Sequence, residues 1–148
     1  MLLGEYLSYH LGTALVGCVK LRLMDILACP YDKHFPLELY ELSRTRYPER
    51  EVKIKEKPLC ELYCAREGKR IEELDREPDC VECLKEEIVD GVLYCPKCGR
   101  WYPIIEEIPI LLPDHLRNKE EDLAFLRKYA DRLPDKITRE GKPFSLEE

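Results

Sequence analysis

The pattern of apolar and polar residues predicts strands most clearly around residues 92–105. Residues 92–94 and 101–105 are mainly β-branched or aromatic, which is typical of strands. The sequence Cys-Pro-Lys-Cys-Gly at residues 95–99 separates them, and Gly99 allows the chain to leave a tight turn with a positive φ. We therefore predict two antiparallel strands joined by this turn.

Weaker alternation predicts three further strands, at residues 20–23, 35–42 and 52–55. Residues 24–27 follow the first of them as one turn of apolar helix. A helical run rich in Glu and Arg is predicted over residues 70–76. The segments between these elements are charged or contain Pro and Gly, and we expect them to be exposed.

A C-terminal helix is predicted after Pro113. Asn118 is a suitable N-cap, and Pro134 ends the helical pattern. Between them, apolar residues recur at helical spacing: Leu123, Leu126, Tyr129, Ala130 and Leu133. Residues 135–148 contain few apolar anchors and are expected to be loose.

Together these elements predict an α+β fold built on a small antiparallel β-sheet, with zinc knuckles, a central Cys-rich insertion and a C-terminal helix. With 148 residues, 45% of them hydrophobic, the chain is long enough to bury one core. The predicted parts are an N-terminal extension at 1–18, a core sheet at 19–57 and 84–113, the insertion at 58–83, and a C-terminal helix and tail at 114–148.

Residues 1–18 are interpreted as an extension from a start site assigned too far upstream, with translation beginning near Val19. Their apolar part is interrupted by Glu5 and His10 and is too short to span a membrane. The first residues also lack the Lys and Arg of a signal sequence. We therefore expect a cytoplasmic protein with no membrane contact.

The formal net charge of −6 argues against an independent nucleic-acid binder. Such proteins derive most of their affinity from Lys and Arg that neutralise phosphates. Any nucleic acid is therefore expected to be held by a partner and only indirectly by this chain.

The chain has eight cysteines, and their spacing favours metal binding over disulfides. Cys95 and Cys98 form half of a tetrahedral Zn²⁺ site. Cys29 offers a third thiolate, and both Asp32 and His34 are placed to act as a ligand after it. Four such ligands leave no position for an activated water, and no catalytic constellation is evident, so we predict that the protein is not an enzyme.

Two more cysteine pairs lie in the predicted insertion, and their spacing allows two pairings. Cys60 and Cys64 can join Cys80 and Cys83 in a zinc module of their own. Alternatively, Cys80 and Cys83 can join the pair at residues 95–98 in a ribbon hairpin. Spacing alone leaves both open.

Three stretches carry a family resemblance: LMDILACP at 23–30, FPLEL at 35–39 and VLYCPKCGRWYPIIEEIPILLP at 92–113. In these the chain resembles the small zinc-knuckle activator family, the common subunit of tRNA and release-factor methyltransferases in eukaryotes and archaea. The resemblance implies a non-catalytic subunit in a heterodimer with an AdoMet-dependent methyltransferase.

The resemblance also implies a ligand set. It assigns the family's zinc site to Cys29, Cys95 and Cys98, and places His34 where longer-spaced members carry a second N-terminal Cys. This favours pairing the four cysteines of the insertion with one another.

The partner is expected to bind a run of apolar residues after the knuckle, since the run is more apolar than one face of a small sheet can bury. The candidate residues are Ile104, Ile105, Ile108, Ile110, Leu111 and Leu112. The alternative is that the whole run is core. The rival functions are a zinc-ribbon nucleic-acid-binding or transcription-associated module, for which only Lys97 and Arg100 supply basic residues near the knuckle, and a rubredoxin-like electron carrier.

Overall fold

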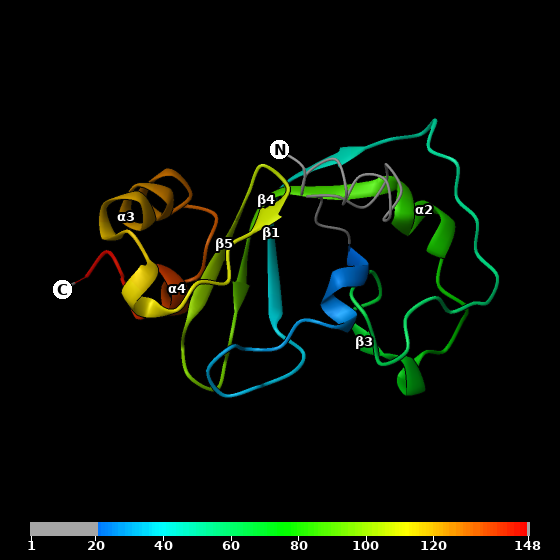
Figure 1. The fold of residues 1–148 in the computed structure, drawn as a ribbon, viewed down its shortest axis with the longest axis horizontal. Coiled ribbons are helices and arrows are strands. Elements are labelled where there is room, and N and C mark those ends of the chain that lie inside the picture. Colours follow the sequence, from blue (N-terminus) through cyan, green and yellow to red (C-terminus); the bar gives the residue numbers. More distant parts are fainter. Residues whose placement is uncertain (1–20, 148) are drawn as a thin grey trace, which may run out of the picture.

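The computed structural model describes residues 21–147, and its centre is a four-stranded antiparallel sheet (Figure 1). The strand order is β1-β4-β5-β6. The strands are β1 (Glu38–Arg46), β4 (Glu86–Tyr94), β5 (Trp101–Ile105) and β6 (Ile108–Pro109). Short helices accompany the sheet, so the predicted α+β fold class is confirmed.

β4 is the central strand because both of its faces are apolar. Leu93 is fully buried in a first core cluster, which it shares with Tyr102 of β5 and with Met24 of η1 (Leu21–Asp25). Val92, one residue earlier, points to the opposite face and belongs to a second core cluster with Trp101. Alternating side chains therefore give the sheet two buried faces.

The second core cluster is completed by the C-terminal helices α3 (Lys119–Lys128) and α4 (Asp135–Thr138), which follow η3 (Asp114–Leu116). The predicted N-cap is confirmed, since the Asn118 side chain accepts a hydrogen bond from the backbone N–H of Glu121. Pro134 precedes α4 and does not end α3.

The expectation of a loose C-terminal tail was wrong, because backbone hydrogen bonds hold it. Trp101 donates its backbone N–H to the carbonyl of Lys142, and Lys142 donates to the carbonyl of Gly99. The indole Nε1 of Trp101 donates to the carbonyl of Phe144 at 2.9 Å. The tail thus lies along the start of β5.

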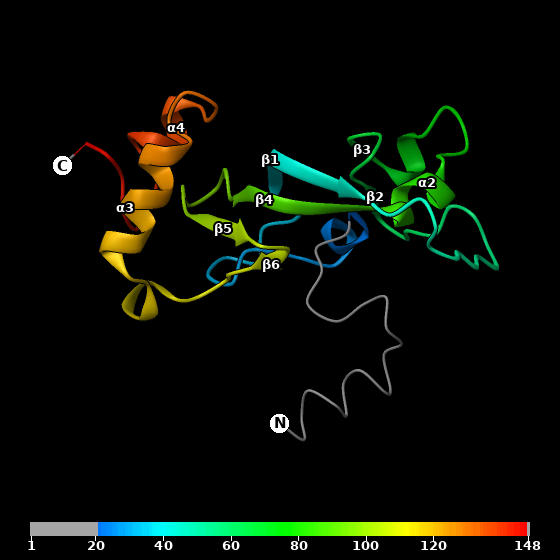
Figure 2. The same cartoon turned by 90° about the horizontal axis from the view of Figure 1, so that it is seen from above.

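The segment predicted as an insertion, residues 58–83, holds β2 (Tyr63–Cys64), β3 (Lys69–Arg70), η2 (Ile71–Glu73) and the start of α2 (Cys80–Lys85). Figure 2 shows it at the end of the sheet opposite to the C-terminal helices. The helical run predicted over residues 70–76 is limited to η2, and α2 was not predicted.

Two predicted strands are absent from the described residues. Residues 21–23 lie in η1, because Leu21 and Met24, three positions apart, both turn into the first core cluster. Residues 52–55 form no strand, since β1 itself pairs along β4 from Glu38 to Arg46 and occupies that edge. The interpretation of residues 1–18 falls outside the described residues.

A buried ion pair anchors the C-terminal helices to the sheet. The Nε atom of Arg117 donates to Asp122 at 2.8 Å, and its Nη1 atom donates to the carbonyl of Trp101 at 2.6 Å. Both side chains are buried. Substituting Asp122→Ala leaves a buried guanidinium without its counter-ion, which should lower the free energy of unfolding by about 3 to 5 kcal/mol.

Denaturant unfolding measures this loss, and Asp75→Ala is the matched control. Asp75 pairs with Lys69 at 3.0 Å on the surface, so its removal should cost less than about 1 kcal/mol. Equal losses for the two variants would contradict the role given to the Arg117 pair.

Candidate metal centre

Two tight turns of the same design form the candidate metal centre. In the turn between β4 and β5, Gly99 donates its N–H to the carbonyl of Cys95, and Cys95 donates to the carbonyl of Arg100, both at 2.9 Å. Gly99 has φ +77°. The predicted knuckle between two antiparallel strands is therefore confirmed, and it turns the thiols of Cys95 and Cys98 to one side.

The turn that follows η1 repeats these contacts. Lys33 donates its N–H to the carbonyl of Cys29 at 2.9 Å, and Cys29 donates to the carbonyl of His34 at 3.0 Å. Lys33 has φ 63°, the conformation that Gly99 adopts in the other turn. Asp32 consequently occupies the position that Cys98 occupies in the knuckle.

The two turns bring four ligand atoms together. One such atom from each of Cys29, Asp32, Cys95 and Cys98 lies within 4.8 Å of all the others, and no other group of three or more does so among residues 21–147. The sulfur atoms of Cys29 and Cys98 are 3.7 Å apart. Two thiolates bound tetrahedrally to one Zn²⁺ at about 2.3 Å would be about 3.8 Å apart, so the spacing fits zinc.

The Asp32 carboxyl ionises readily, whereas the buried Cys95 thiol holds its proton. The backbone N–H of His34 donates to Asp32 at 2.9 Å, and this bond, together with the three nearby thiols, lowers the pKa of Asp32 to about 2. Burial raises the pKa of Cys95 to about 12, and the neighbouring thiols of Cys98 and Cys29 add to this. A metal ion would displace the thiol protons.

The two N-terminal ligand candidates lie differently relative to the three thiols. The group includes Asp32 and leaves out His34. His34 instead contributes backbone: its N–H holds the Asp32 carboxylate and its carbonyl accepts from Cys29.

A side-chain clasp joins both turns to the C-terminal part of the chain. The Arg100 guanidinium lies 3.7 Å from the centre of the Tyr31 ring and donates to Asp114 at 2.9 Å. The backbone N–H of Asp114 donates to the hydroxyl of Tyr31 at 2.7 Å. Tyr31 belongs to the first turn and Arg100 follows the second, so the clasp holds them together from outside.

The four cysteines of the insertion lie elsewhere, around one separate cavity. Since Cys95 and Cys98 face Cys29, the ribbon pairing of Cys80 and Cys83 with Cys95 and Cys98 is not the arrangement in the structure.

The four residues of the metal centre lie in a part of the chain that matches a known protein family. A family model described as "Trm112p-like protein" matches residues 20–107, more than half of the chain. The chain belongs to the Trm112p-like family. The match confirms the resemblance to the methyltransferase activator family, and the matched residues include all four members of the metal centre. Searches of curated proteins and of solved structures found no match to the chain.

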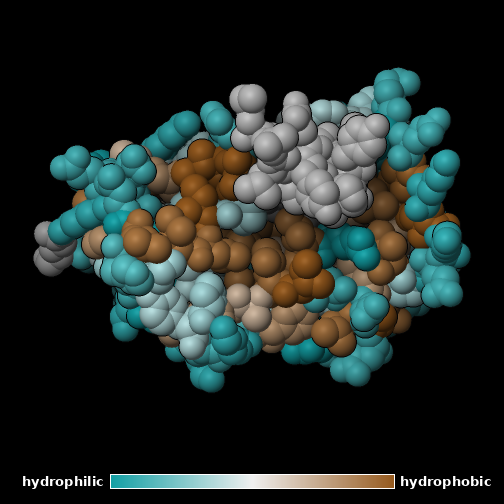
Figure 3. Space-filling model, in the orientation of Figure 1, coloured by the Kyte–Doolittle hydropathy of each residue, from teal (hydrophilic) through white to brown (hydrophobic). Residues whose placement is uncertain are grey.

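The apolar run after the knuckle is divided between core and surface in this Trm112p-like chain. Ile104 is fully buried in the first core cluster and is not open to a partner, while Ile110 and Leu111 are half-buried. Three residues remain outside: Ile105, 38% exposed, Ile108, 51% exposed, and Leu112, 38% exposed. We call these three the apolar ridge. Figure 3 shows apolar side chains gathered over the middle of the side of the molecule that Figure 1 also presents.

The turn between β5 and β6 presents the first two ridge residues as a pair. Ile105 and Ile108 are opposite each other in the ladder. The residues between them, Glu106 and Glu107, both have positive φ, 49° and 68°, which costs free energy for residues other than Gly. Backbone N–H bonds from Glu106 to the Asp90 side chain and from Glu107 to a β4 carbonyl hold this turn.

No helix among residues 21–147 has the length and apolar character needed to cross a membrane.

Proposed function

We propose that this protein is a non-catalytic activator and stabilising subunit of AdoMet-dependent methyltransferases that act on tRNA, on a translation release factor, or on both. Membership of the Trm112p-like family carries this proposal. The apolar ridge supports it, because exposed branched side chains on and just after a hydrogen-bonded hairpin suit association with a partner.

The proposal includes one structural Zn²⁺ held by Cys29, Asp32, Cys95 and Cys98. Three thiolates and one carboxylate fill the tetrahedral coordination of zinc, which leaves no place for a reacting water. The ion would supply a cross-link between the N-terminal turn and the knuckle. The protein would then serve as a scaffold, with AdoMet and substrate bound by the partner.

Direct nucleic-acid binding is less well supported. Of the two basic residues beside the knuckle, Arg100 is already bonded to Asp114 and lies over Tyr31. Lys97 alone remains exposed there. The net charge of −6 would oppose binding to phosphates.

Co-purification tests the proposal. In separate experiments, the untagged chain is expressed together with each AdoMet-dependent methyltransferase encoded in the same genome. The methyltransferase carries the affinity tag each time. We expect at least one enzyme to retain the chain at one-to-one stoichiometry and to be more soluble with it than without it. Retention by none of these methyltransferases, or retention by tRNA alone, would overturn the proposal.

A further inference from the structure

The insertion brings two pairs of cysteines to one cavity from two separate arms. The first arm, with Cys60 and Cys64, is tied to η1 by Asp25. The Asp25 carboxylate accepts three successive backbone N–H groups, from residues 61–63, at 2.7 to 2.9 Å. Burial opposes ionisation of Asp25, but these hydrogen bonds outweigh it and keep its pKa below the usual value. The loop between the two cysteines is therefore fixed against the core.

The second arm is the first turn of α2. Asp79 caps this helix by accepting the backbone N–H of Glu82 at 3.1 Å. Cys80 and Cys83 are three positions apart in the helix, and side chains with that separation lie on the same side. Both thiols therefore reach the cavity that the first arm also lines.

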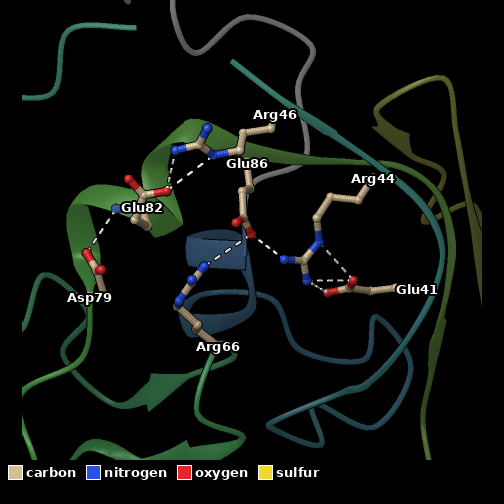
Figure 4. A network of polar contacts seen from close by, with 7 residues as sticks. All are labelled: Glu41, Arg44, Arg46, Arg66, Asp79, Glu82 and Glu86. Atoms are coloured by element: carbon tan, nitrogen blue, oxygen red, sulfur yellow. Dashed lines mark hydrogen bonds and ion pairs between the residues drawn. The ribbon is translucent and has the colours of Figure 1, made fainter. Parts of the chain in front are cut away.

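A network of ion pairs fixes the two arms relative to each other, as Figure 4 shows. Arg66, which follows the first arm, donates to Glu86, the first residue of β4 directly after α2, at 3.1 Å. Glu86 also bonds Arg44 of β1, and Arg46 bonds Glu82 at 2.7 Å. The two arms are thus joined both to β1 and to one another.

The cavity between the arms is the size of a single ion. Its volume is about 10 Å³, close to the least that admits one water molecule, which is too small for an organic ligand. Cys64 and Cys80 are buried in its wall, and Arg22 and Arg66 also line it. The two guanidinium groups, of which Arg66 also pairs with Glu86, would offset part of the double negative charge of a zinc ion bound to four thiolates.

The insertion also needs a stabilising cross-link, because it has almost no apolar core. Between residues 58 and 83, all of which the structure describes, the buried residues are Cys64, Pro78 and Cys80. Segments this small that fold stably usually rely on a metal or on disulfides. Two of the three buried residues of this segment are therefore cysteines.

We infer that Cys60, Cys64, Cys80 and Cys83 bind a second structural Zn²⁺, independent of the centre at Cys29. In the present structure no three of these sulfur atoms come within 4.8 Å of one another. Binding therefore needs the cysteine side chains to turn into the cavity, with the two arms in place, until the sulfur atoms are about 3.8 Å apart, the separation set by Zn–S bonds of about 2.3 Å. Zinc is the divalent ion that a four-thiolate set is best suited to hold in such a structural role.

Metal analysis of the full chain tests the inference. The chain is purified from zinc-containing medium and its zinc content is measured by elemental analysis and native mass spectrometry. We expect two zinc ions per chain in the parent and one in the double variant Cys60→Ser, Cys83→Ser. The matched control Cys18→Ser, which removes a cysteine outside both sets, should keep two.

The single tryptophan, Trp101, reports on the core in the same samples. It is fully buried in the second core cluster, away from the insertion, so its fluorescence should be unchanged in the double variant. Proteolysis should instead cut the variant within residues 58–83. One zinc ion in the parent, or two in the double variant, would overturn the inference.

If the double variant precipitates, the parent still decides the question. Alkylation of the four cysteines in the parent should be blocked until a chelator is added. Alkylation without chelator, or disulfide bonds among the four in freshly purified protein, would overturn the inference. None of these measurements involves a methyltransferase, so the result is independent of the proposed function.

Discussion

Replacing Ile108 by Asp is expected to abolish binding to a methyltransferase while leaving the isolated protein folded. Burying a branched aliphatic side chain against a partner contributes about 1.5 to 3 kcal/mol, and a desolvated carboxylate adds an opposing cost of similar or larger size. The affinity should therefore fall at least about a thousandfold, equivalent to about 4 kcal/mol. Because Ile108 is 51% exposed, the melting temperature of the isolated chain should stay near that of the parent.

The measurement is titration calorimetry or co-purification with the methyltransferase that the parent retains. Leu62→Asp is the matched control, since Leu62 is 57% exposed but lies in the insertion, far from the apolar ridge. Binding by Ile108→Asp at parental affinity, or an equal loss in Leu62→Asp, would remove the ridge from the interface. Unfolding of Ile108→Asp and Ile105→Asp alike would show that the ridge is core.

Replacing Cys95 by Ser is expected to remove one zinc ion per chain and to unfold the sheet at temperatures where the parent is stable. Metal binding supplies on the order of 10 kcal/mol in isolated zinc fingers, which is comparable with the whole stability of a small domain, about 5 to 15 kcal/mol. Cys95 is fully buried within the first core cluster, so no solvent ligand can replace its thiolate without opening the core.

Thermal unfolding with and without a chelator separates a metal ligand from an ordinary core residue. A chelator should lower the melting temperature of the parent strongly, and that of Cys95→Ser much less. Asp32→Cys is the matched gain-of-ligand variant, since it completes the second Cys-x2-Cys turn and should retain zinc against higher chelator concentrations. Full zinc content in Cys95→Ser would show that the ion is not at this centre.

The central hairpin of the fold could be predicted from sequence because its signals are local. β-branched and aromatic residues flank a Cys-Pro-Lys-Cys-Gly turn, and Gly99 has the positive φ that the turn requires. The Asn118 cap of α3 is likewise local. Each of these elements follows from residues within a few positions of one another.

Elements that depend on distant partners were predicted less well. β1 extends to Arg46 because it pairs with β4 some forty residues later, and residues 52–55 are left without a partner strand. The anchoring role of Asp25 has no signal in the sequence, because its three donors are more than 30 residues away. The helix α2 had a usable signal in the Asp79 and Glu82 capping pattern, next to the cysteines.

Within the metal centre, the spacing left both Asp32 and His34 open, and the family resemblance favoured His34. The group holds Asp32, in a turn where the positive φ of Lys33 matches that of Gly99 in the knuckle. A Lys at this position does not indicate a positive φ, whereas Gly99 in the matching turn does. The similarity of the two turns became visible only in their hydrogen bonds.

The clasp of Tyr31, Arg100 and Asp114 has a thermodynamic consequence. Tyr31 belongs to one metal-binding turn, Arg100 leaves the other, and Asp114 begins the path to α3. Docking of the C-terminal helices and occupancy of the metal site therefore share these three side chains. By linkage, this coupling is reciprocal. Undocking of the helices weakens metal binding, and release of the metal weakens docking of the helices by the same free energy.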